Sequence, residues 1–183
     1  MTEKYVLLLR GINVTPSTRV AMSDLRELVS EAGYSGVRTL LQSGNVILES
    51  SAPPNVPDLD RAITSRTGVN SRALVLDAAR FRRIVAACPL GDVALDEIDF
   101  DESKALITFV ERMPEPGAVA RLSDAELAPE RLVLGSDAVY QWLPDGVLAT
   151  KLPPKFARQF GDNATARNLR TSKRIVALLD PAS

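Results

Sequence analysis

The chain of 183 residues contains no histidine and only one cysteine, Cys88. Without histidine it cannot form a Ser-His-Asp or Cys-His catalytic unit from its own residues, and imidazole ligands for a metal are excluded. A single cysteine cannot make an internal disulfide. Cys88 also follows Phe81, Ile84 and Val85 at helical spacing, where a buried structural thiol is expected. We therefore expect no metal and no cofactor.

The sequence also lacks long apolar runs and a strong excess of charge. No apolar stretch approaches the ~18 residues of a membrane span, and the start of the chain leads into a short apolar strand without a signal peptide. We expect a cytoplasmic protein without membrane association, and a monomer by default. The composition of 45% hydrophobic and 25% charged residues is typical of a globular domain. A net charge of −1 argues against a general nucleic-acid coat.

Residues 1–77 predict a complete β-α-β-β-α-β unit. Apolar runs, helical periodicity and turn residues indicate strands at 5–9, 37–42, 45–49 and 72–76, with one helix after Ser23 and another from Pro57. This order is the ferredoxin-like split βαβ plan. The predicted core consists of Leu7, Leu9, Leu25, Val29, Val46, Leu48, Ile63, Leu74 and Leu76.

Residues 78–103 predict a helix, 78–88, and an acidic linker whose spacing matches no EF-hand loop. Residues 104–183 predict a second α/β subdomain with a basic C-terminal helix capped by Thr171. Its other predicted elements are strands at 105–110, 131–134 and 138–143 and helices at 117–122 and 155–160. The fold class is thus α/β (α+β), with two ferredoxin-like subdomains built on mainly antiparallel sheets.

A basic block precedes the last predicted helix. Residues 151–183 contain seven lysines or arginines but only Asp162 and Asp180 as acids, and four of the cations lie within residues 164–174. A helix start offers unpaired amides and a partial positive charge, so cations beside it favour an anion such as phosphate or carboxylate. The alternative is a solvated basic helix face, which is the usual meaning of a charge run.

Polar residues also gather at the end of the first predicted strand, around the turn at 42–45, and at Lys151. Loops at strand ends commonly carry ligand contacts, although Ser43-Gly44-Asn45 is also a competent tight turn without further purpose. We predict that these clusters and the basic block meet in one cleft between the two halves. The candidate ligand-binding residues are Arg10, Asn13, Arg19, Gln42, Asn45, Lys151, Arg167, Asn168, Thr171 and Lys173.

These clusters carry motifs of a known family. The stretches L-L-R-G-I-N-V at 8–14, M-S-D-L-R at 22–26, Q-S-G-N-V at 42–46, K-L at 151–152, A-T-A-R-N at 164–168 and T-S-K at 171–173 resemble the bacterial family named domain of unknown function 1697. The resemblance implies two ferredoxin-like subdomains in a cytosolic protein and brings no established activity. The chain departs from the family pattern at Thr15-Pro16 (usually Gly-Gly), Thr150 (usually Ser) and Leu169 (usually aromatic).

The leading hypothesis is a binding module for a small anionic ligand, a nucleotide or a phosphorylated metabolite, because arginine suits bidentate phosphate contacts. The first alternative is RNA or DNA binding, since ferredoxin-like sheets can carry RNA, but the strands show no exposed aromatic pair for base stacking. The second is an enzyme acting on a phosphorylated substrate. Without histidine its acid–base chemistry would fall to Lys151, a carboxylate or a tyrosine.

Overall fold

The computed structural model describes residues 1–93, 100–115, 124–153 and 155–180. The chain forms two compact units, one comprising Met1–Arg82 together with the residues from Ile175 onward, and the other comprising Arg83–Arg174. The boundary falls inside α3 (Ala78–Ala86), and the end of α6 (Leu169–Leu179) belongs to the first unit. The division predicted from the sequence, with all of residues 104–183 in the second subdomain, stays a prediction.

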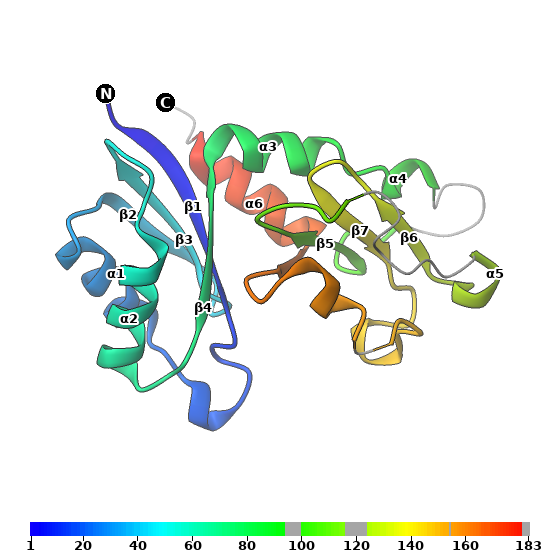
Figure 1. Cartoon of the computed structure of the whole chain (residues 1–183). Coiled ribbons are helices and arrows are strands. Elements are labelled where there is room, and N and C mark those ends of the chain that lie inside the picture. The colour runs from blue at the N-terminus through cyan, green and yellow to red at the C-terminus, as the bar shows by residue number, and fades with distance from the viewer. Residues whose placement is uncertain (94–99, 116–123, 154, 181–183) are drawn as a thin grey trace. The chain divides into compact units, whose positions relative to one another are not determined.

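The first unit is built on a four-stranded antiparallel sheet in the order β2-β3-β1-β4. Helices α1 and α2 lie side by side on one face of this sheet (Figure 1). The elements are β1 (Glu3–Arg10), the 3-10 turn η1 (Pro16–Thr18), α1 (Met22–Glu31), β2 (Ser35–Leu40), β3 (Asn45–Ser50), α2 (Val56–Thr67) and β4 (Arg72–Asp77).

Strand β1 is buried on both faces of the sheet. Leu7 and Leu9 join the cluster beneath α1 and α2, while Leu8, on the opposite face, stands across from Leu74 of β4. Period-two alternation explains why one continuous apolar run serves two buried faces. The predicted core is confirmed, because all nine of its residues are buried.

The end of α6 is tied to the first unit by polar contacts. Lys4 Nζ donates to the carbonyl of Leu179 at 2.8 Å. Arg82 makes a bidentate contact with Asp180, through Nε at 2.9 Å and Nη2 at 2.6 Å. These contacts explain why the last turn of α6 belongs to the first unit although its first turn belongs to the second.

The second unit repeats the arrangement with an antiparallel sheet in the order β6-β7-β5-β8. The fold class predicted from the sequence is therefore confirmed. The remaining elements are α4 (Leu90–Val93), β5 (Ala105–Phe109), α5 (Asp124–Leu127), β6 (Arg131–Leu134), β7 (Ala138–Trp142), the 3-10 turns η2 (Val147–Ala149) and η3 (Ala157–Phe160), and β8 (Thr165–Asn168).

Two elements of the second unit differ from the sequence prediction. Residues 165–168, predicted only as a polar block, form β8, which pairs along β5. The predicted helix at 155–160 is instead the short turn η3, although Phe156 and Phe160 make the expected contact, with ring centroids 5.3 Å apart. The predicted helix at 117–122 and residues 94–99 of the acidic linker lie outside the described residues.

The predicted caps of two helices are also wrong. Helix α1 begins at Met22 with Ala21 as its N-cap, and the hydroxyl of Ser23 donates instead to Asp24. Helix α6 begins at Leu169, and the side chain of Asn168 accepts from the amide of Thr171 at 2.8 Å. Asparagine is as good a cap as threonine or better. Strand β8 ends at Asn168, and the helix begins at the next residue.

Gly44 should be far more sensitive to substitution than another glycine with positive φ. A Cβ at Gly44 (φ +73°) would lie 2.7 Å from Leu9 Cβ and Ile12 Cδ1, whereas a Cβ at Gly33 (φ +92°) would meet nothing within 4 Å. We expect Gly44→Ala to cost about 2–4 kcal/mol of stability, from backbone strain and overpacking together. Gly33→Ala should cost about 1–2 kcal/mol from strain alone. Urea unfolding of both variants checks this, and equal losses would contradict it.

Candidate functional site

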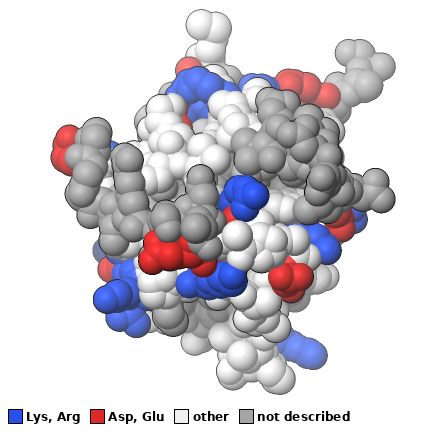
Figure 2. Space-filling model, turned by 90° about the vertical axis from the view of Figure 1, so that its right-hand side faces the viewer, with Lys and Arg blue, Asp and Glu red and all other residues white. Residues whose placement is uncertain are grey.

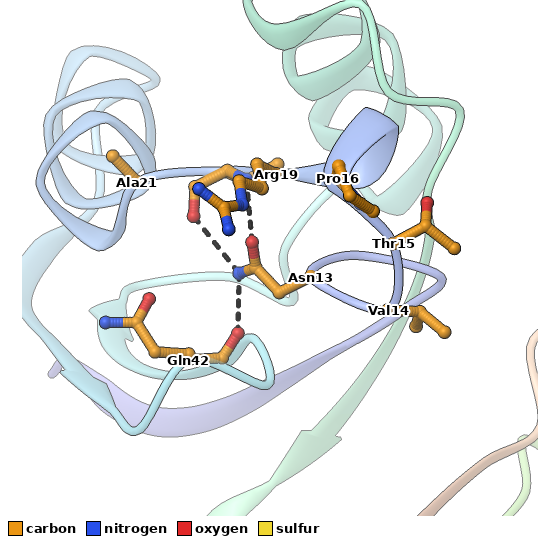
Figure 3. A pocket seen from close by; sticks show the side chains of 8 residues that line it. Asn13, Val14, Thr15, Pro16, Arg19, Ala21 and Gln42 are labelled. Atoms are coloured by element: carbon orange, nitrogen blue, oxygen red, sulfur yellow. Dashed lines mark hydrogen bonds between the residues drawn. The ribbon is translucent and has the colours of Figure 1, made fainter.

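A pocket of about 560 Å³ lies in the first unit where the β1–α1 loop meets the β2–β3 turn (Figure 3). It contains polar side chains from both segments and apolar side chains from the loop. Its lining residues are Asn13, Val14, Thr15, Pro16, Arg19, Val20, Ala21 and Gln42. This is the strand end at which the sequence predicted ligand contacts.

The side-chain amide of Asn13 joins the two segments. Its Nδ2 donates to the carbonyl of Val20 at 3.1 Å and to that of Gln42 at 2.6 Å, and its Oδ1 accepts from the amide of Val20 at 2.9 Å. Asn13 adopts φ 54°, a left-handed conformation that asparagine tolerates better than most residues. The amide of this predicted ligand-binding residue is therefore engaged in shaping the pocket.

The β1–α1 loop is ordered largely by its own hydrogen bonds. The hydroxyl of Thr18 accepts from the amides of Val14 at 3.1 Å and Thr15 at 3.0 Å, and the carbonyl of Thr18 accepts from the amide of Asn13 at 2.7 Å. Pro16 begins η1 and has no amide hydrogen to offer. The backbone amides of residues 13–15 are thus already used, so side chains must supply most ligand contacts in this pocket.

Arg19, Gln42 and Thr15 are the exposed polar side chains of the lining, and the hydroxyl of Thr15 already contacts those of Ser17 and Thr18. Figure 3 shows Arg19 between Pro16 and Ala21, beside the amide of Asn13, with Gln42 on the other side of that amide. In the described part of the chain no carboxylate forms an ion pair with Arg19. Gln42 uses its backbone carbonyl, not its side chain, to accept from Asn13. The side chains of Arg19 and Gln42 can therefore face a ligand.

The other two predicted residues of the first unit lie outside this lining. Arg10 is the exposed last residue of β1 and stands opposite Arg72 of β4. Asn45 is 2% exposed, and its Nδ2 donates to the carbonyl of Leu40 at 2.8 Å and to the hydroxyl of Ser43 at 3.0 Å. These contacts close the β2–β3 turn, as the turn interpretation of this segment predicted.

Arg167 is buried in the second unit. It is 8% exposed on β8, and its Nη1 donates to Thr165 Oγ1 at 3.0 Å and to the carbonyl of Ala166 at 2.7 Å. Burial lowers the pKa of Arg167 to about 10, so the guanidinium remains cationic at neutral pH. It stands opposite Ile107 of β5, on β8 at the edge of the sheet.

The cations at the start of α6 are paired with acids from residues 101–102. Arg170 contacts Asp101 at 2.9 Å, and Lys173 contacts Glu102. A hydrogen bond from the amide of Ser103, with Arg170 nearby, lowers the pKa of Asp101. Of the amides at this helix start, that of Arg170 donates to the carbonyl of Glu102 at 3.4 Å, and that of Thr171 donates to Asn168. This helix start is thus largely satisfied by the protein itself.

Lys151 lies beside a buried carboxylate that the sequence analysis missed. Glu130 is 5% exposed and accepts from Thr150 Oγ1 at 2.9 Å, Gln141 Nε2 at 3.0 Å and the amide of Lys151 at 2.5 Å. The ammonium of Lys151 donates to the carbonyl of Ala128. Glu130 therefore fixes the loop that carries Lys151, and only its position just before a predicted strand could have drawn attention to it.

Apart from Arg10 and Asn45, the predicted site residues thus fall into two groups. Asn13, Arg19 and Gln42 come together in the pocket of the first unit. Lys151 and the residues from Arg167 to Lys173 belong to the second unit. The convergence of the two groups in one cleft stays a prediction.

Residues 1–140 match the family described as "Protein of unknown function (DUF1697)". The chain belongs to the DUF1697 family. This confirms the resemblance drawn from its motifs. A search of curated proteins finds no match.

Among solved structures, this DUF1697 protein is similar to the conserved bacterial protein SP0830 from Streptococcus pneumoniae. The TM-score is 0.67 at 21% sequence identity, and the alignment covers 98% of this chain and 100% of that one. At this identity the likeness establishes the fold alone. Within the described residues, no group of Cys, Asp or Glu side chains is arranged to hold a metal ion, and no helix is long and apolar enough to cross a membrane.

Asn13→Asp should destabilise the first unit, because it replaces the two Nδ2 donors with an oxygen that faces the carbonyls of Val20 and Gln42. Aspartate also tolerates the left-handed backbone, so the change isolates the loss of the amide. We expect a loss of about 2–4 kcal/mol, measured by chemical denaturation. Asn70→Asp, at an exposed position, is the matched control and should stay within about 0.5 kcal/mol of the parent. A similar loss in both variants would refute this role for Asn13.

Glu130→Ala should destabilise the second unit by about 2–4 kcal/mol, because it leaves the donors of Gln141, Thr150 and the Lys151 amide without their acceptor. Hydrogen exchange should also become faster at the amide of Lys151. Glu115→Ala removes an exposed carboxylate and should change stability by less than about 0.5 kcal/mol. Unchanged exchange at Lys151 would show that Glu130 does not hold this loop.

Proposed function

We propose that this DUF1697 protein is a binding module for a small anionic ligand, held in the pocket of its first unit. The observation that carries the proposal is Arg19, an exposed guanidinium at the lining of a 560 Å³ pocket with no carboxylate partner among the described residues. A planar guanidinium matches the two oxygens of a carboxylate or phosphate.

The rest of the lining supports a small-molecule ligand. The volume falls within the roughly 300–1,000 Å³ typical of small-molecule sites. Gln42 adds a side-chain amide, and Thr15 adds a hydroxyl that is within 2.9 Å of Ser17 Oγ. The two segments are held together by Asn13, so the backbone that carries these groups is positioned before a ligand arrives, which lowers the ordering cost of binding.

Electrostatics favour this pocket over the start of α6. At α6, Asn168 and Glu102 already occupy two amides, and Arg170 and Lys173 are already in ion pairs. By contrast, Ala21 lines the pocket and caps α1 without any side-chain hydrogen bond. The partial positive charge of that helix start adds to that of Arg19, although Asp24 in the first turn offsets part of it.

The nucleic-acid alternative has less support. On the face shown in Figure 2, described lysines and arginines alternate with aspartates and glutamates instead of forming a continuous basic surface. A platform for base stacking needs exposed aromatic side chains. The aromatic residues of the described strands are all buried: Tyr5, Phe109, Tyr140 and Trp142.

Thermal-shift measurements with inorganic phosphate, sugar phosphates and nucleotides test the proposal. A ligand at about 100 times its Kd should add about 2.7 kcal/mol of stability. We expect Arg19→Ala to abolish this gain without lowering the stability of the ligand-free protein, because Arg19 is exposed.

Arg26→Ala is the matched control, since Arg26 is also exposed but does not line the pocket. It should keep the full ligand-induced gain. The proposal fails if no anion stabilises the parent protein, or if Arg19→Ala retains the stabilisation.

A further inference from the structure

The lining of the pocket also indicates what the anionic group is attached to. Val14 is 76% exposed although it is a large apolar side chain, and Pro16 in the lining is exposed as well. Figure 3 shows Val14 and Pro16 on one side of the pocket and Gln42 on the other, with Arg19 between them. A bare phosphate or a sugar phosphate would leave this apolar side in water.

Gln42 adds a second requirement. Its backbone is held by Asn13, while its exposed side chain carries an amide group with both a donor and an acceptor. A glutamine amide pairs with two adjacent polar atoms on the edge of a planar heterocycle, as it does with adenine. An apolar wall and a donor–acceptor pair together suit a heteroaromatic ring.

We infer that the ligand is a nucleoside monophosphate, with its base between Val14 and Gln42 and its phosphate on Arg19. This inference rests on the proposed function, because it keeps the same pocket and the same role for Arg19. It goes further because it requires a nucleobase. A sugar phosphate carries the negative charge but has no heteroaromatic ring.

Calorimetric titration with the four ribonucleoside 5′-monophosphates, ribose 5-phosphate and adenosine tests it. The best nucleotide should bind at least about ten-fold more tightly than ribose 5-phosphate, a difference of about 1.4 kcal/mol. Val14→Ser should reduce that ratio several-fold without weakening ribose 5-phosphate. Gln42→Ala should weaken the nucleotide several-fold more than it weakens ribose 5-phosphate. Val147→Ser, at another exposed valine outside the pocket, should leave the ratio unchanged.

The outcomes separate the two claims. Equal, Arg19-dependent binding of ribose 5-phosphate and the best nucleotide would overturn the inference and leave the proposed function standing. Adenosine binding as tightly as its monophosphate would overturn the role of the phosphate. If none of these anions binds in an Arg19-dependent manner, both the inference and the proposed function fail.

Discussion

The side-chain amide of Asn13 is the contact on which the pocket depends. It satisfies both polar groups of Val20 and the carbonyl of Gln42, so it fixes the β1–α1 loop against a turn some thirty residues away in the sequence. The β2–β3 turn is also held by β1, because the amide of Leu9 donates to the carbonyl of Gly44 at 2.8 Å. A Cβ at Gly44 would lie 2.7 Å from Leu9 Cβ and Ile12 Cδ1, so the turn packs closely on this strand and the loop after it. A pocket wall made of two loops needs such fixed anchors, since loops are otherwise the most mobile parts of a fold.

The sequence predicted the first unit well because its signals are local and agree with one another. The apolar run of β1, the helical stripe of α1 and the turn at 43–44 each point to the same sheet, and burial confirms them. Strand β8 carries no such signal. Its four residues, Thr-Ala-Arg-Asn, place an arginine at a buried position, and only pairing with β5 makes them a strand. Long-range pairing of that kind leaves little trace in the local pattern.

Polar residues at strand ends were harder to interpret than the core. Asn13, Asn45 and Asn168 each came from motifs that suggested ligand contacts, yet their amides bind the backbone around them. Asparagine competes well for nearby backbone groups, so the same residue type suits a cap, a turn or a ligand site. Glu130 is the opposite case, a residue with a clear structural role that the sequence did not reveal. Its partners Gln141 and Thr150 lie well beyond it in the sequence, and no spacing rule connects them.

In the proposed function, a ligand-binding group differs from an architectural one in whether the protein already satisfies its charge and hydrogen bonds. The cations that looked most suited to an anion in the sequence, Arg170 and Lys173, are neutralised by Asp101 and Glu102, which come from the stretch taken for a solvated linker. Asp101 and Glu102 thus neutralise two of the four cations of the basic block. Arg19, in contrast, is in no ion pair among the described residues. That isolation is the property that matters, because a guanidinium without a carboxylate neighbour keeps its capacity for an external anion.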